Sequence, residues 1–252
     1  MKRSEIYSDL RAIEPCFVRL DGRNFKRTLD RLGFEKPYDA RLRDGFVNAA
    51  LRLFRESGLD PVFIYTFSDE VSVFFRNLPF DRRVEKIDSV LASFFASALT
   101  IELGVDTPLA FDSRIVCVHP ETIVDYLHWR QAECFRNCLN SYVYYALRKG
   151  GVGDAGESYP IDGKEAARIM KGMKAPDMHE LLFSCGININ DVDAWQRRGM
   201  LVYNEECTKE GLNPFDGEHV VTSRRRIVVD MDIPLFSSSA GQVLVGQLCN
   251  RL

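Results

Sequence analysis

Residues 15–25 read PCFVRLDGRNF, a mostly apolar run that closes on Asp21 and Gly22. A run of this kind with an Asp-Gly pair behind it predicts a buried strand that ends in a tight turn. A carboxylate at the end of a core strand is rigid and partly desolvated, which suits a metal ligand. Gly22 would also let a phosphate or a metal ion approach the backbone closely. The plainer alternative is that the pair forms only a turn.

The elements that follow give this turn a partner. Apolar spacing predicts two helices and three further strands: helices over 40–57 and 83–103, and strands over 61–67, 71–75 and 109–118. The order β-α-β-β-α-β predicts an α+β fold of the ferredoxin-like type, with additional helices and C-terminal strands after it. In that fold the first strand lies antiparallel beside the third. Asp21 should therefore meet the second acidic turn, Asp69-Glu70, at one edge of the sheet.

Two carboxylates on such a palm-like sheet can hold two Mg²⁺ ions, which sit roughly 3.5–4 Å apart and clamp the attacking and leaving oxygens of a displacement. Asp21 and Asp69 would supply the carboxylates, and the carbonyl of Gly22 would add an oxygen. Glu70 follows Asp69 on the strand and so faces the other side. We therefore treat Glu70 as a candidate catalytic residue that supports the metal ligands without itself binding the metal ion.

Basic residues accompany the acidic turns. Six of them surround the first turn: Arg19, Arg23, Lys26, Arg27, Arg31 and Lys36. Such a cluster beside carboxylates suits a phosphorylated substrate that bridges both, although charge runs are more often a solvated face. Arg83 and Lys86, at the start of the second predicted helix, are candidates to hold a triphosphate. The alternative for these two residues is a solvated helix start.

The totals describe an ordinary globular protein. The chain has 252 residues, is 46% hydrophobic and 27% charged, and has a net charge of −3, which fits one large domain or two small ones. Apolar runs stay well below the roughly 20 residues of a membrane span. The charged start, MKRSE, has no hydrophobic signal core behind it, so we predict a cytoplasmic location.

Seven cysteines without any C-x-x-C pair argue against a disulfide framework or a standard zinc site. Cys134 and Cys138 lie four residues apart in a predicted helix over 120–149. Two thiolates alone do not close a tetrahedral site, so we interpret them as packing residues, with metal binding as the alternative.

The second half of the chain is expected to begin at the glycine-rich stretch 150–156, which divides a palm-like catalytic domain, 1–150, from a C-terminal region, 151–252. We classify this region as basic from its local clusters of Lys and Arg. Two helices over 163–174 and 176–183 and two strands over 200–205 and 220–230 are predicted there. Its basic residues include Lys164, Arg168, Lys171, Lys174 and the run Arg224-Arg225-Arg226. The serine-rich segment 237–241 is predicted to be mobile.

Several motifs resemble those of the tRNA(His) guanylyltransferase family. Arg19–Phe25 (RLDGRNF) is similar to its first motif, and Ser68–Ser72 (SDEVS) to its second acidic motif. Further similar blocks are 34–37 (FEKP) with Asp39, 111–114 (FDSR), 125–127 (DYL) and 129–132 (WRQA). The resemblance runs from about residue 19 to residue 190. The order and spacing of the motifs together are far more specific than any one of them.

The resemblance implies a polymerase-type palm enzyme that extends RNA in the 3′–5′ direction. Such enzymes activate the 5′ end of a tRNA with ATP or GTP and then attack it with the 3′-hydroxyl of an incoming nucleoside triphosphate. If the family's site residues are transferred to the matching positions of this sequence, the resemblance implies that magnesium is held by Asp21, Gly22 and Asp69. The nucleotide contacts are Asp21, Gly22, Arg23, Asn24, Phe25, Lys26, Ser68 and Asp69. The resemblance also implies that the protein is a homotetramer. The basic residues of the helices predicted in region 151–252 lead us to expect that this region contacts the tRNA.

The sequence departs from the family pattern at three places. The guanylyltransferases proper carry a His-Ile-Asn-Asn-Leu block where residues 135–139 read FRNCL, and Lys-Asn-Glu where residues 178–180 read MHE. Tyr38 stands where an asparagine is usual. These departures resemble the guanylyltransferase-like branch, which adds nucleotides opposite a template and repairs 5′-truncated tRNAs, and such an enzyme would also accept the other nucleoside triphosphates.

Two other classes of protein share part of this pattern. A palm-type nucleotide cyclase would also use the acidic edge and a triphosphate, but the basic clusters of the second half have no role with a small substrate. An RNA-binding module without catalysis would explain the basic residues. Asp69-Glu70 argue against such a module, because carboxylates that face a phosphate need a metal ion between them.

Overall fold

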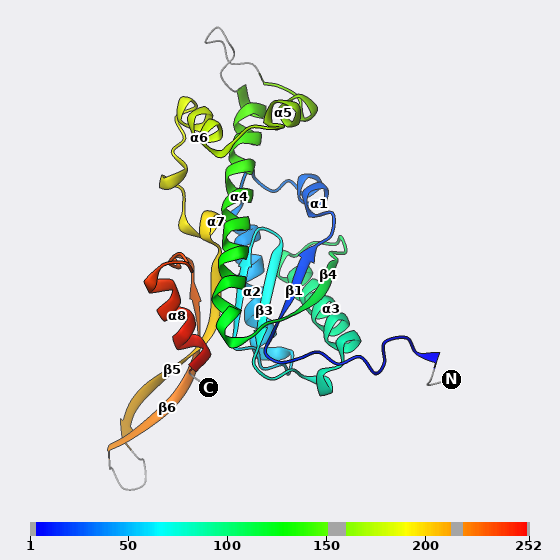
Figure 1. The fold of residues 1–252 in the computed structure, drawn as a ribbon, viewed down its shortest axis with the longest axis vertical. Coiled ribbons are helices and arrows are strands. Elements are labelled where there is room, and N and C mark those ends of the chain that lie inside the picture. The colour runs from blue at the N-terminus through cyan, green and yellow to red at the C-terminus, as the bar shows by residue number, and fades with distance from the viewer. Residues whose placement is uncertain (1–3, 151–159, 213–218, 251–252) are drawn as a thin grey trace.

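The computed structural model describes residues 4–150, 160–212 and 219–250. One six-stranded antiparallel sheet, in the order β4-β1-β3-β2-β5-β6, runs through the molecule (Figure 1). Its strands are β1 (Cys16–Gly22), β2 (Phe63–Phe67), β3 (Glu70–Phe75), β4 (Phe111–Cys117), β5 (Met200–Leu212) and β6 (His219–Asp230). β1 lies between β3 and β4, as the ferredoxin-like order predicts.

The alternation of side chains along β1 divides the core into two layers. Cys16, Val18 and Leu20 pack into the layer beneath α2 (Ala40–Glu56) and α3 (Val84–Leu103). Phe17 packs into the opposite layer, beneath α4 (Ile123–Gly150) and α8 (Ser239–Asn250). A strand covered on both faces is expected to read as a continuous apolar run, which is how β1 begins. Figure 1 shows the sheet between these two helix layers.

The remaining elements gather around the far part of α4. They are α1 (Phe25–Arg31), α5 (Gly163–Met170), α6 (Ala175–Ser184) and α7 (Ala194–Arg198), with a short 3₁₀ turn over Ile189–Asp191. Two other 3₁₀ turns, over Phe80–Arg82 and Pro120–Thr122, precede α3 and α4. A third apolar cluster, which includes Leu139, Val143, Ala166 and Leu182, fixes α5 and α6 against α4. At the opposite end of the molecule from α5 and α6, the β5–β6 hairpin projects away from the body (Figure 1).

One expectation for the connecting segments needs correction. The segment 237–241, predicted to be mobile, instead leads into α8, because the backbone N–H of Gly241 donates to the Ser238 hydroxyl and Val245 and Leu248 are buried in the core. Of the basic residues that follow Asp21, Lys26, Arg27 and Arg31 lie in the helix α1. Most of the proposed glycine-rich boundary lies outside the described residues. Within the described ranges, no helix is long and apolar enough to cross a membrane.

Asp39 fixes the start of α2. Its carboxylate accepts from the backbone N–H groups of Arg41, at 2.8 Å, and Glu35, at 2.7 Å, and from the Arg41 guanidinium, at 2.6 Å. The side chain is 4% exposed. These donors stabilise the ionised form, and together they lower the pKa of Asp39 to about 2 despite its burial.

We predict that Asp39→Asn lowers the free energy of unfolding at neutral pH. Asparagine keeps the capping oxygen but loses the charge, and the pKa shift corresponds to about 2 kcal/mol. Because the folded-state pKa lies below the unfolded value of about 3.9, this stability is present above pH 4 and is lost as the pH falls towards 2. Urea unfolding across this pH range measures it. Asp44→Asn, which removes an exposed carboxylate of the same helix, is the control, and an equal loss at pH 2 would contradict the assignment.

Candidate active site

The end of β1 and the turn between β2 and β3 meet at one edge of the sheet, as the topology predicts. Asp21 lies directly opposite Glu70 of β3 and opposite Asp112 of β4. The backbone N–H of Gly22 donates to the carbonyl of Asp69 at 3.0 Å. The two acidic turns, which are far apart in the sequence, are thus joined by a main-chain hydrogen bond.

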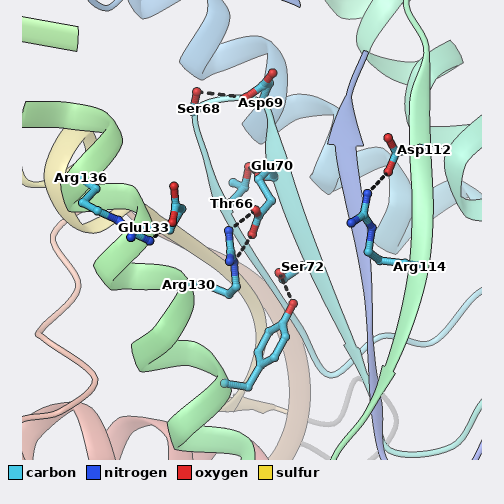
Figure 2. A network of polar contacts seen from close by, with 11 residues as sticks. Thr66, Ser68, Asp69, Glu70, Ser72, Asp112, Arg114, Arg130, Glu133 and Arg136 are labelled. Carbon is cyan, nitrogen blue, oxygen red and sulfur yellow. Dashed lines mark hydrogen bonds and ion pairs between the residues drawn. The ribbon is translucent and has the colours of Figure 1, made fainter. Parts of the chain in front are cut away.

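Asp69 lies in a strained turn. Ser68 has a positive φ of 51°, and its hydroxyl donates to the Asp69 carboxylate at 3.2 Å (Figure 2). Burial raises the pKa of Asp69, and the negative charge of Asp21 raises it further. A cation between the two carboxylates would stabilise the ionised form of Asp69. This electrostatic arrangement fits a metal ion at the edge.

Glu70 has a different partner. Both of its oxygens accept from the guanidinium of Arg130 on α4, at 2.8 and 2.5 Å, and the two residues are only 7% and 6% exposed. Burial raises the pKa of Glu70, while the hydrogen bonds and charge of Arg130 oppose that rise. In Figure 2, Asp69 stays at the turn while Glu70 reaches towards α4. Glu70 is therefore already bound by a cation of the protein.

A cavity of about 380 Å³ adjoins Asp69. Aromatic side chains make much of its wall: Phe25, Phe34, Tyr38, Phe46, Phe67, Tyr144, Tyr145 and Trp195. Lys26 and Arg43 add positive charge, with the Lys26 ammonium 4.3 Å from the centre of the Tyr144 ring and the Arg43 guanidinium 5.2 Å from that of Trp195. A concave, mostly apolar site with several aromatic rings and a few charged groups suits a nucleobase that carries phosphates.

Gly22 is required by the packing at this corner. A Cβ atom there would lie 2.5 Å from the ring of Phe25, which is buried against Phe46 and Phe111. The following Arg23 and Asn24 are exposed, and Asn24 has a φ of 58° at the turn into α1. Of the residues predicted to bind the nucleotide, Phe25, Lys26, Ser68 and Asp69 line the cavity.

Arg83 and Lys86 lie elsewhere. α3 follows β3, and the end of β3 at Phe75 is paired with Cys16, at the opposite end of β1 from Asp21. The backbone of Arg83 forms an isolated antiparallel β-bridge with that of Arg11. The Lys86 ammonium lies 5.0 Å from the centre of the Phe80 ring. Within one chain, the structure does not bring these two residues to the edge that carries Asp21 and Asp69.

Sequence reasoning did not assign three contributors to this region. Asp112, which lies opposite Asp21, forms an ion pair with Arg114 at 2.7 Å. Tyr144 and Trp195 reach the cavity from α4 and α7. Asp112 was visible within a motif, but nothing local in the sequence relates Trp195 to Asp69. Within the described part of the chain, no three His, Cys, Asp or Glu side chains gather as a metal site, so the candidate ligands are two carboxylates and a carbonyl.

Comparison with known proteins gives a consistent result. Residues 1–119 match the family model described as tRNAHis guanylyltransferase, and residues 121–230 match the one described as Thg1 C terminal domain. The chain belongs to the tRNA(His) guanylyltransferase family. A probable tRNA(His) guanylyltransferase of Bos taurus is 33% identical over 94% of this chain and 83% of its own length. The tRNA(His) guanylyltransferase of Schizosaccharomyces pombe is 30% identical over 85% and 82%.

Solved structures of the family share this fold. A bacterial tRNA(His) guanylyltransferase (Thg1)-like protein in complex with ATP superimposes with a TM-score of 0.75 at 22% identity and covers 99% of this chain and 97% of its own. The tRNA(His) guanylyltransferase from Saccharomyces cerevisiae gives a TM-score of 0.65 at 25% identity over 79% and 90%. The palm-like α+β fold is thereby confirmed, and the family membership makes the chain a nucleotidyltransferase.

We predict that Arg130→Met destabilises the protein by about 3–5 kcal/mol, because it leaves the buried Glu70 charge without a partner. The double variant Glu70→Gln/Arg130→Met removes both charges and should recover much of that loss. Denaturant unfolding of the wild type, both single variants and the double variant gives the coupling energy. Additive losses would mean that the pair contributes no coupling.

Proposed function

We propose that this protein adds nucleotides to the 5′ end of tRNA in the 3′–5′ direction, after activating that end with ATP or GTP. The observation that carries this proposal is the main-chain bond between Gly22 and Asp69, which fixes two carboxylates beside an aromatic cavity in a chain of the guanylyltransferase family.

The donor set at the edge suits Mg²⁺, which uses few carboxylates and completes its octahedron with water and substrate phosphates. In the proposed mechanism Asp21 and Asp69 hold the ions together with the Gly22 carbonyl. When bound, two Mg²⁺ ions would stabilise the charge that develops on the attacking and leaving oxygens.

The chain's own side chains orient the reactants. The aromatic wall of the cavity would receive the base of the activating nucleotide, and Lys26 would face its phosphates. The Ser68 hydroxyl fixes one oxygen of Asp69, which sets the direction of the carboxylate. The ion pair of Glu70 with Arg130 holds the start of β3 against α4, so we assign Glu70 a positioning role for the catalytic turn.

The expected partners follow from the same proposal. Lys171, which follows α5, and Lys174, which precedes α6, are exposed and suit contacts with tRNA phosphates. Region 151–252 as a whole is not basic, since its 11 Lys and Arg residues stand against 15 Asp and Glu residues, so the contact is expected at this local cluster. Arg226 in β6 is ion-paired with Glu205, so it is a weaker candidate than its sequence run indicated. The homotetramer and the cytoplasmic location implied by the sequence remain predictions, and light scattering of the purified protein would measure the first.

Asp21→Ala and Asp69→Ala should each abolish nucleotide addition while the protein stays folded. Each change removes a ligand from a site that stabilises transition-state charge. The assay is extension of a 5′-truncated tRNA in Mg²⁺, with circular dichroism to check the fold. Asp60→Ala, which removes an exposed carboxylate near the opposite end of the sheet, should retain activity. Near-normal turnover of either site variant would show that the metal site is misplaced.

We also propose that addition follows a template. Two of the departures from the family pattern lie in contact, because the ring of Phe135 on α4 stacks on His179 of α6 with centroids 6.2 Å apart. An aromatic pair can stack on any base, whereas hydrogen-bonding groups discriminate between bases. Base choice would then come from pairing with the opposite strand.

Templating predicts the product for each of four truncated tRNAs that carry A, C, G or U opposite the missing nucleotide. The added nucleotide should be the complementary one in every case, because only the opposite base differs among the four substrates. Sequencing of the extended 5′ ends, with all four nucleoside triphosphates present, measures this. Addition of guanosine to all four would assign the protein to the guanylyltransferases proper.

A further inference from the structure

Trp129 lies on the first third of α4 with 50% of its surface exposed. A single exposed apolar side chain is common on protein surfaces and means little by itself. The surroundings of Trp129 are unusual, however, because it lies beside the buried pair of Glu70 and Arg130 at the acidic edge of the sheet. Half of a large aromatic surface is thus open to solvent next to the proposed catalytic residues.

The ring is held in place from the protein side. The guanidinium of Arg130 lies 4.3 Å from the ring centre, and Glu70 fixes that guanidinium through both of its oxygens. Tyr126 meets the indole edge-on at 5.9 Å, and its own hydroxyl is 2.8 Å from that of Ser72. A platform that is already ordered loses little conformational entropy when a ligand stacks on it.

The charge around Trp129 fits a polyanion. The Arg19 guanidinium lies 5.4 Å from the ring centre, two residues before Asp21 on the same side of β1. No carboxylate of the described residues lies within ion-pair distance of Arg19. An aromatic surface with neighbouring cations is the combination that binds single-stranded nucleic acid, since bases stack while phosphates meet the positive charge.

Trp129 does not line the cavity, although the two adjoin at Arg130, whose guanidinium lies 5.8 Å from the ring centre of the cavity residue Phe67. Asn140, the cavity residue of α4 nearest to Trp129 in sequence, follows it by eleven positions, which corresponds to about 17 Å along a helix. The base of the activating nucleotide is assigned to the cavity. The exposed face of Trp129 can therefore bind a second base.

We propose that the terminal base at the 5′ end of the RNA stacks on Trp129 while that end lies next to Asp21 and Asp69. This inference rests on the proposed function and names a positioning residue for its RNA substrate. Stacking tolerates any base, so the platform would serve RNA ends of different sequence.

The test uses a tRNA that lacks its first nucleotide and carries 2-aminopurine as its new 5′-terminal base, whose fluorescence is quenched on stacking. Trp129→Leu should abolish the quenching on binding and raise the KM for this RNA about 5- to 150-fold, the range expected for the loss of one stacked base. Trp129→Phe should restore most of the quenching and bring the KM for this RNA most of the way back to the wild-type value. The KM for ATP at saturating RNA should not change.

Tyr7→Ala is the matched control, because Tyr7 is another exposed aromatic residue, at 69% against 50% for Trp129, and lies outside the sheet edge. It should bind and quench like the wild type. Full quenching with Trp129→Leu would overturn the proposal, and so would an equal rise in the KM for ATP, which would indicate a structural defect. If the wild type bound this RNA without quenching, only the platform would be refuted, whereas no RNA binding would refute the proposed function as well.

Discussion

The antiparallel pairing of β1 with β3 is the constraint on which the site depends. Its register places Asp21 opposite Glu70, and its last main-chain bond joins Gly22 to Asp69. A slip of this register by one residue would turn Phe17 and Val18 to the wrong core layers, so the packing of the whole sheet enforces it. The geometry of two carboxylates at the edge is thus maintained by apolar contacts throughout the strand.

The buried pair of Glu70 and Arg130 extends this constraint from the sheet to α4. Desolvation of two charges is costly, and such a pair is weak evidence for net stability. Its geometry is nevertheless specific, since a bidentate guanidinium accepts little rotation. The pair therefore fixes where α4 crosses the acidic edge, and with it the positions of Trp129 on one turn and of the cavity residue Tyr144 further along.

The parts of this structure that were predictable are those encoded locally. The apolar runs ending at Gly22 and beginning at Glu70 have strand periodicity, and the order of elements then required Asp21 and Asp69 to converge. Arg83 and Lys86 were assigned by their place at a helix start, but the direction of β3 carries that helix start to the opposite end of the sheet. The helix α8 was not predicted because the serine-rich segment at its start was interpreted as mobile. Ser238 in that segment is in fact the capping residue of the helix. Trp195 could not be related to the site, since only the path of the chain through α7 brings it there.

The pairing of β2 with β5 has a consequence for the synthesis of the chain. Phe63 is paired with Tyr203, so one edge of β2 stays open until the ribosome has made most of the protein. During that interval a fully buried strand of the final fold, FIYTF, has an unpaired row of backbone donors and acceptors. An open apolar edge of this kind is a template for association with other chains. The segment from β1 to β4 is thus synthesised long before its sheet is complete, and its folding without association depends on the later strand β5.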